Sequence, residues 1–103
     1  MDFDLQLSPH FSNDLDRILF YYLNTLYAEA AAKNLINQVD KTINVIRNDP
    51  FLFPRYHAKQ IADRGYRYAF IGNYLLFYLI REKENRVIIA RMLYGRSNII
   101  DIL

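Results

Sequence analysis

Residues 66–93 read YRYAFIGNYLLFYLIREKENRVIIARML, and this stretch decides the fold. Its aromatic and β-branched residues predict three strands, over 66–71, 74–80 and 86–93. Gly72-Asn73 predicts a two-residue hairpin turn, and the polar residues 81–85 predict a longer one. The C-terminal half of the chain is therefore expected to form consecutive antiparallel strands.

The residues before these strands change from a two-residue period to a helical one. Residues 3–7 alternate apolar and polar side chains, which predicts a short strand that ends at Ser8-Pro9. Apolar residues then recur at three- and four-residue steps, which predicts helices over 11–27 and 29–48. Asp49-Pro50 is expected to end the second helix.

Each helix is expected to bury one apolar stripe. The first stripe consists of Phe11, Leu15, Ile18, Leu19, Tyr22 and Leu26. The second consists of Ala32, Leu35, Ile36, Val39, Ile43 and Ile46. Ser12 or Asn13 is expected to cap the first helix, and Asp14 and Asp16 are expected to interact with the positive end of its dipole.

The order β-α-α-β-β-β predicts an α+β domain in which a helical hairpin packs on one face of a small, mainly antiparallel sheet. A chain of 103 residues has room for one domain, residues 1–103. Residues 51–65 have no clean period and form a long connection, a kind of segment that often has a function. Residues 98–103 form a short tail that packs on the domain or docks elsewhere.

Several classes of protein are disfavoured by composition. The chain has no cysteine, which excludes disulfides, and neither His10 nor His57 has a carboxylate at a metal-ligand spacing. We therefore expect no metal and no cofactor. The N-terminal Met-Asp-Phe-Asp lacks an export signal, and no apolar stretch approaches membrane-spanning length, so a cytoplasmic location without a membrane is expected.

Charge is distributed unevenly along the chain. Residues 1–54 contain four basic and seven acidic side chains, a balance of −3, whereas residues 55–103 contain nine basic and four acidic ones, a balance of +5. The second half is thus suited to an anion or an acidic partner. A solvated charged surface would have the same composition, and both interpretations stay open.

The expected strand register places side chains on faces. A tight turn at Gly72-Asn73 puts Arg67 opposite Tyr78, and pairing of Arg81 with Arg86 puts Leu76 opposite Arg91. On this register one face of the sheet presents Arg67, Tyr74, Tyr78 and Arg91. A one-residue slip in the second hairpin would send Arg91 to the other face.

Arginines within apolar strands are costly to bury unpaired, so they face solvent or pair with a carboxylate. Because acidic residues are scarce in this half, we expect the arginines to lie on an open, anion-facing side of the sheet. Guanidinium groups beside tyrosines suit RNA, through phosphate contacts and base stacking, and suit a protein partner equally well.

Three stretches in this order resemble the RelE/ParE toxin superfamily of type II toxin–antitoxin systems. They are Gly65-Tyr66-Arg67, the Gly-Asn-Tyr-Leu-Leu-Phe-Tyr of 72–78 and the Arg-Met-Leu-Tyr-Gly-Arg of 91–96. The last is similar to the Arg-Val-Leu-His-Gly-Arg pattern of ParE-type members, with Tyr94 in place of histidine. The resemblance covers nearly the whole chain and implies the same fold.

The resemblance implies two alternative activities. RelE-type members are metal-independent endoribonucleases that cut messenger RNA on the ribosome with the ribose 2′-hydroxyl as nucleophile. By this resemblance Arg67 and Arg96 would be catalytic, Lys59 lies near the family's lysines, and Tyr94 would be an acid or a stacking platform. The Glu/His pair of some members has no counterpart, because no histidine follows His57.

ParE-type members bind DNA gyrase, trap its cleaved complex and need no catalytic residues. The Leu-Tyr-Gly-Arg ending and the modest net charge of +2 favour this type. We therefore expect a growth-inhibiting toxin directed at gyrase and bound by a cognate antitoxin, with the ribosome-dependent nuclease as the alternative and a non-toxic binding module as a third hypothesis. The expected partner-binding residues are Arg67, Tyr74, Tyr78, Arg91 and Arg96.

Overall fold

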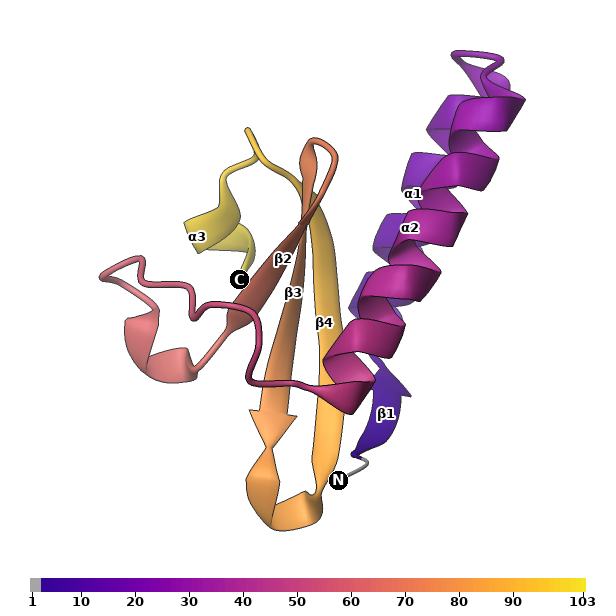
Figure 1. Cartoon of the computed structure of the whole chain (residues 1–103). Helices are drawn as coiled ribbons and strands as arrows, with labels where there is room; N and C mark the ends of the chain where they lie inside the picture. The colour runs from indigo at the N-terminus through magenta and orange to yellow at the C-terminus, as the bar shows by residue number, and fades with distance from the viewer. Residues whose placement is uncertain (1–2) are drawn as a thin grey trace.

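The computed structural model describes residues 3–103, so Met1 and Asp2 of the N-terminal tetrapeptide lie outside the described residues. The elements follow the predicted order (Figure 1). They are β1 (Asp4–Leu7), α1 (Pro9–Asn24), α2 (Glu29–Asn48), β2 (Arg67–Ile71), β3 (Tyr74–Arg81), β4 (Arg86–Tyr94) and a short α3 (Ile99–Ile102). Two single 3-10 turns occur at Ala62–Arg64 and Glu82–Glu84. The predicted fold class is confirmed.

The four strands form one sheet in the order β1-β4-β3-β2, with β1 parallel to β4 and the other pairs antiparallel. Gly72 has a φ of 57°, a left-handed conformation that suits glycine in the tight turn between β2 and β3. The first hairpin has the predicted register, since Ile71 lies opposite Tyr74 and Arg67 lies opposite Tyr78.

The helical hairpin covers one face of the sheet and extends beyond its upper end (Figure 1). The main core joins apolar side chains of both helices to those of the strands, including Phe11, Leu35, Val39, Ile46, Leu76, Tyr78, Val87 and Ile89. Two predicted core residues, Leu26 and Ile36, are exposed instead. Leu26 lies beyond the end of α1, which stops at Asn24 and not at residue 27.

The cap of α1 differs from the expectation of Ser12 or Asn13. Ser8 is the N-cap, because its hydroxyl accepts a hydrogen bond from the Phe11 amide at 3.0 Å and Pro9 occupies the first helical turn. The same hydroxyl donates to the Ala90 carbonyl at 2.7 Å. The start of α1 is thereby attached to β4.

Strand β4 contains a β-bulge that corrects the expected face of Arg91. Tyr78 lies opposite Ile89 as predicted, but Phe77 lies opposite Arg91 and Leu76 opposite Met92, so Ala90 is the extra residue. Arg91 therefore projects from the face opposite to Arg67, Tyr74 and Tyr78. The expectation that these four residues share a face is wrong.

Arg91 is paired with a carboxylate and does not face an open surface. Asp14, on α1, accepts hydrogen bonds from Arg91 Nε at 2.8 Å and Nη2 at 2.9 Å, and from the Met92 amide at 3.0 Å. Asp14 is 2% exposed. Its role is thus this pairing and not the expected interaction with the helix dipole, and the partner of Arg91 comes from the acidic first half of the chain.

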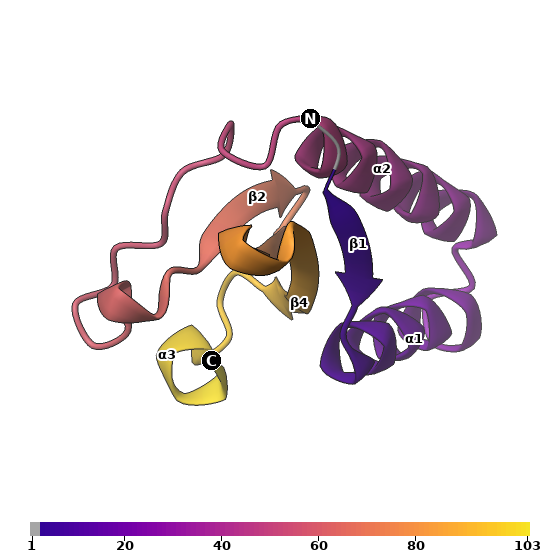
Figure 2. The same cartoon turned by 90° about the horizontal axis from the view of Figure 1, so that it is seen from below.

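The face of the sheet away from the helical hairpin is not open. The connection 51–65 and α3 lie over it (Figure 2). A second apolar cluster forms here from Leu75, Phe77, Leu93 and Ile99, with Tyr56, Tyr66, Tyr68 and Leu103 packed against it. The expected open, anion-facing side is therefore wrong, because the tail docks on the sheet and the connection follows the outer edge of β2.

Replacement of Asp14 by Asn is expected to destabilise the fold by about 3 kcal/mol, because it leaves the Arg91 guanidinium without its counter-charge in a partly buried site. Urea unfolding monitored by circular dichroism measures this free energy. The matched control is Asp16→Asn on an exposed position of the same helix, which should stay within about 0.5 kcal/mol of the unmodified chain. Equal stabilities of the two variants would contradict this role for Asp14.

Candidate functional site

Arg67 holds the connection 51–65 against the start of β2. Its Nη1 donates to the Phe53 carbonyl at 2.7 Å and to the Phe51 carbonyl at 3.4 Å, and its guanidinium lies 5.3 Å from the centre of the Phe51 ring. Tyr78, on the same face, is fully buried and donates its hydroxyl to the Pro50 carbonyl at 2.7 Å. Both side chains are thus used within the fold.

Burial shifts the titration of Tyr78. Burial raises the pKa of the Tyr78 phenol to about 12, although the positive charge of Arg67 acts in the opposite direction. At neutral pH the phenol is protonated and serves as a donor. The ring and the hydroxyl of Tyr78 are both enclosed within the fold.

A cluster of tyrosines lies at the other end of the sheet, beside the Gly72-Asn73 turn. Tyr74 of β3 and Tyr94 of β4 pair across the strands with ring centres 5.9 Å apart, and Tyr21 and Tyr22 of α1 lie 6.4 Å apart. Burial first, and then the hydrogen bond with Tyr22, raise the pKa of Tyr74 to about 12. The cluster joins α1 to the tip of the first hairpin.

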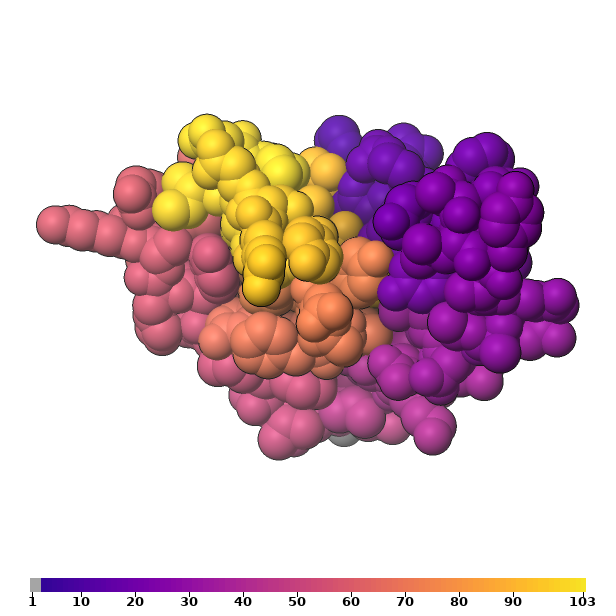
Figure 3. Space-filling model, turned by 90° about the horizontal axis from the view of Figure 1, so that it is seen from above, coloured from indigo at the N-terminus to yellow at the C-terminus, as the bar shows by residue number. Residues whose placement is uncertain are grey.

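Arg96 follows this cluster at the end of β4. Together with Tyr94 and Phe70 it lines a shallow hollow of about 360 Å³ beside the hairpin turn. Gly95 brings the chain close to that turn, because its amide donates to the Asn73 carbonyl at 2.8 Å and an added Cβ would lie 3.1 Å from the same oxygen. The C-terminal segment and the helical hairpin flank this end of the molecule (Figure 3).

The residues predicted to be catalytic do not assemble in one place. Arg67 pairs with Tyr78 at the start of β2, whereas Tyr94 pairs with Tyr74 beside the turn that follows β2, so the two lie near opposite ends of β2. Four residues of strand separate these ends by roughly 13 Å. Lys59 is exposed on the connection that borders the Arg67 end, whereas Arg96 is exposed at the Tyr94 end.

Asp14 and Arg17 lie close to Tyr94, because all three line one hollow between α1 and β4. Neither was predicted from the sequence as a site residue. Asp14 lies at a three-residue step from Phe11 and a four-residue step from Ile18, within the apolar stripe of α1. A carboxylate at a buried position needs a partner, so the place of Asp14 in the apolar stripe was the signal in the sequence that it forms an ion pair. The partner itself, Arg91, could be identified only from the tertiary structure.

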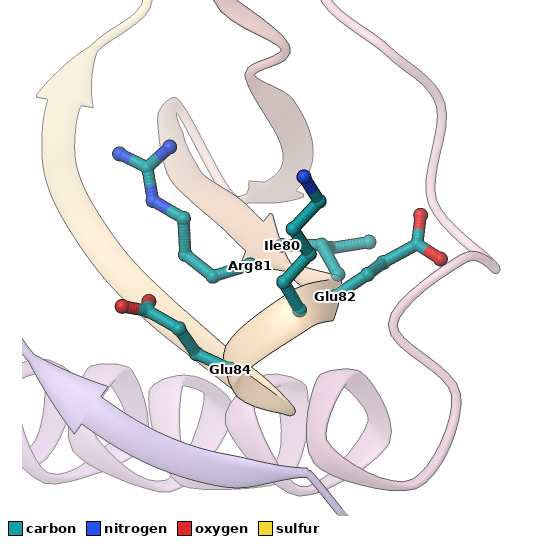
Figure 4. Close-up of a pocket in the computed structure, with 5 residues that line it drawn as sticks. Ile80, Arg81, Glu82 and Glu84 are labelled. Carbon is teal, nitrogen blue, oxygen red and sulfur yellow. The ribbon is translucent and has the colours of Figure 1, made fainter.

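Another hollow, of about 650 Å³, lies away from these residues, at the turn between β3 and β4. It is lined by residues 80–84, and the side chains of Arg81 and Glu84 extend toward one side of the turn whereas that of Glu82 extends toward the other (Figure 4). Within residues 3–103, no group of three side chains could hold a metal ion, and no helix is both long and apolar enough to cross a membrane. Tyr94 and Arg96 are exposed and line one hollow with Phe70, so the Tyr94–Arg96 end is the candidate binding site.

Similar folds occur in solved structures of toxin–antitoxin systems. A chain of the chromosomal ParDE system of P. aeruginosa has a TM-score of 0.69 and 11% sequence identity, covering 89% of this chain and 95% of that one. A chain of a RelBE toxin–antitoxin complex from Mycobacterium tuberculosis has a TM-score of 0.58 and 16% identity, covering 91% and 99%. The fold is that of the RelE/ParE class of toxins.

The sequence narrows this class to one family. The profile described as "ParE toxin of type II toxin-antitoxin system, parDE" matches residues 5–99. The chain belongs to the ParE toxin family. No curated protein matches the chain in sequence.

In an alkaline titration, Tyr74 and Tyr78 are expected to lose their protons at a higher pH than a phenol with an ordinary pKa near 10, since the pKa of each is raised to about 12. Because the pKa of these phenols is higher in the folded state, their contribution to the free energy of unfolding is fully present below pH 10 and is lost as the pH rises through about 12. Phenolate absorbance measures the titration, and Tyr74→Phe should remove one of the late-titrating groups. An unchanged late component in Tyr74→Phe would contradict the assignment.

Proposed function

We propose that this chain is a growth-inhibiting toxin that acts by binding DNA gyrase and trapping the complex of gyrase with cleaved DNA. Membership of the ParE toxin family supports a toxin, and the arrangement of the site favours gyrase over the ribosome. The proposed toxin needs a complementary surface and no catalytic group. It acts in the cytoplasm, where gyrase and its DNA are found.

The observation that carries this proposal is the separation of the predicted catalytic residues. A nuclease that activates a 2′-hydroxyl needs its acid, base and charge-stabilising groups around one phosphate, within hydrogen-bond reach. Here Arg67 is hydrogen-bonded to two backbone carbonyls at the start of β2, and Tyr94 and Arg96 lie beyond the other end of that strand, roughly 13 Å away along the hairpin. Binding alone makes no such demand.

The Tyr94–Arg96 end supplies a suitable contact surface. Exposed Tyr and Arg side chains are favoured anchors of protein interfaces, because they combine apolar area with hydrogen bonding. Tyr94 is 43% exposed and Phe70 is 70% exposed, and both line the same hollow as Arg96. We propose this end as the contact with gyrase.

A cognate antitoxin is the second proposed partner. The two structures with similar folds are described as a ParDE system and a RelBE toxin–antitoxin complex. The eleven residues from Ile18 to Ala28, where α1 ends and α2 is about to begin, contain no charged side chain. Several large apolar side chains of this segment are exposed, including Phe20, Tyr21, Leu23, Leu26 and Tyr27. Such a surface is consistent with a protein partner.

Induced expression should arrest growth, with gyrase–DNA cleavage complexes accumulating while transcripts stay intact. Arg96→Ala is expected to lower the yield of cleavage complexes about tenfold, because it removes an anchor of the contact surface. Arg67→Ala should instead lower stability while the folded fraction keeps its effect on gyrase. The yield is measured by gel electrophoresis of plasmid DNA after protein denaturation.

Transcripts cut within coding frames, without trapped gyrase, would overturn the proposal in favour of a ribosome-dependent nuclease. Lys83→Ala is the matched control, because it removes an exposed positive charge from the turn at the far end of the sheet. Normal growth with the folded protein present in the cell would contradict a toxin altogether and leave a binding module.

A further inference from the structure

A third hollow lies where α1, β4 and α3 meet, and we call it the α1–β4 hollow. Its volume is about 390 Å³, within the range of small binding pockets. Ile18, Met92 and Ile102 contribute apolar lining, and Arg17, Tyr94 and Ser97 contribute polar groups. Tyr94 also lines the adjoining hollow that contains Arg96, so the two hollows share one wall.

The charges at this hollow do not balance. Asp14 uses both carboxylate oxygens on Arg91 and the Met92 amide, at 2.8 to 3.0 Å. Arg17 Nη1 lies 3.9 Å from Asp14 Oδ1, and its side chain is 76% exposed. One carboxylate therefore faces two guanidinium groups and is already engaged by Arg91, which leaves the positive charge of Arg17 to an incoming anion.

Among the described residues, Arg17 forms no ion pair besides the long one with Asp14. Asp101 of α3 accepts a hydrogen bond from the Asn98 side-chain amide at 2.6 Å and makes no ion pair with Arg17. Within residues 3–103, Arg96 has neither an ion pair nor a side-chain hydrogen bond, so it adds a second uncommitted guanidinium beyond Tyr94. The two connected hollows thus offer an apolar lining between two positive groups.

We propose that the α1–β4 hollow binds an acidic peptide segment of the cognate antitoxin, with an apolar side chain on Ile18 and Ile102 and carboxylates at Arg17 and Arg96. Two guanidiniums around an apolar lining suit such a segment better than a nucleic acid, whose binding depends on many phosphate contacts. The basic second half of the chain is complementary in charge to this partner. This inference rests on the proposed function for the existence of the antitoxin.

Occupation of the hollow would also neutralise the toxin. A segment that contacts Arg17 and Arg96 passes over Tyr94, which lies in both hollows. The proposed gyrase contact is then covered, and the toxin is inactive by occlusion of its surface. Arg17 itself lies outside the gyrase contact, so antitoxin affinity and gyrase trapping can be separated by mutation.

The first test measures the affinity of the full chain for the antitoxin encoded beside it, by isothermal titration calorimetry. Arg17→Gln is expected to weaken binding about tenfold, and Arg17→Gln with Arg96→Gln to weaken it further. Arg47→Gln, an exposed arginine near the end of α2 and outside the hollow, is the matched control and should bind as the unmodified chain does. Melting temperatures within about 2 °C show that the variants are folded.

The second test uses defined peptides and does not depend on the antitoxin. Acetyl-Leu-Glu-Leu-amide should shift the backbone amide signals of Ile18, Tyr94 and Ser97 in nuclear magnetic resonance spectra, and acetyl-Leu-Gln-Leu-amide should not. Arg17→Gln should remove the effect of the glutamate peptide, and Arg47→Gln should retain it. Equal shifts with both peptides, or shifts with neither, would overturn the acidic specificity of the hollow.

Each failure has a distinct signature. If the antitoxin binds the unmodified chain and Arg17→Gln with equal affinity, the inference is wrong and the proposed function stands. If no neighbouring protein binds the chain but the glutamate peptide does, the toxin–antitoxin pairing is wrong and the hollow keeps its specificity. If Arg17→Gln loses gyrase trapping but keeps its antitoxin affinity, the hollow belongs to the target and the inference is overturned.

Discussion

The buried carboxylate of Asp14 is the constraint on which the rest of this structure depends. It accepts two hydrogen bonds from Arg91 and one from the Met92 amide, so one side chain of α1 satisfies both a partly buried cation and an edge amide of β4. Ser8, six residues earlier, binds the Ala90 carbonyl. The first turns of α1 thereby complete the edge of β4 just beyond the point where β1 ends.

The β-bulge at Ala90 follows from the same contacts. One extra residue in β4 turns Arg91 away from the main core and places Met92 within it, at 1% exposure. Without the bulge, Arg91 would project toward the helices among apolar side chains, at a large cost in desolvation. The ion pair of Asp14 with Arg91 joins the acidic first half of the chain to the basic second half. The uneven distribution of charge therefore stabilises the fold, in addition to its proposed role in binding.

The two ends of β2 have different surroundings. At its start, Arg67 and the opposite residue Tyr78 bind backbone carbonyls of Pro50, Phe51 and Phe53 and so anchor the connection that follows α2. At the other end, Tyr94 and Arg96 are exposed beside hollows that adjoin the helical hairpin. Family motifs therefore contain residues of both kinds: the arginine of Gly65-Tyr66-Arg67 supports the fold, and the arginine that ends residues 91–96 is available to a partner.

The sequence by itself determined the order of elements, the bounds of α2, the Gly72-Asn73 turn and the register of the first hairpin, because these depend on local periodicity and turn chemistry. Family membership also followed from the motifs of residues 65–96. The tertiary structure alone decided the face of Arg91, the partner of Asp14 and the covering of the second face by α3 and residues 51–65. A bulge, a buried ion pair and a docked tail join residues far apart in the chain, for example 77 positions in the case of Asp14 and Arg91, and no local pattern encodes such contacts.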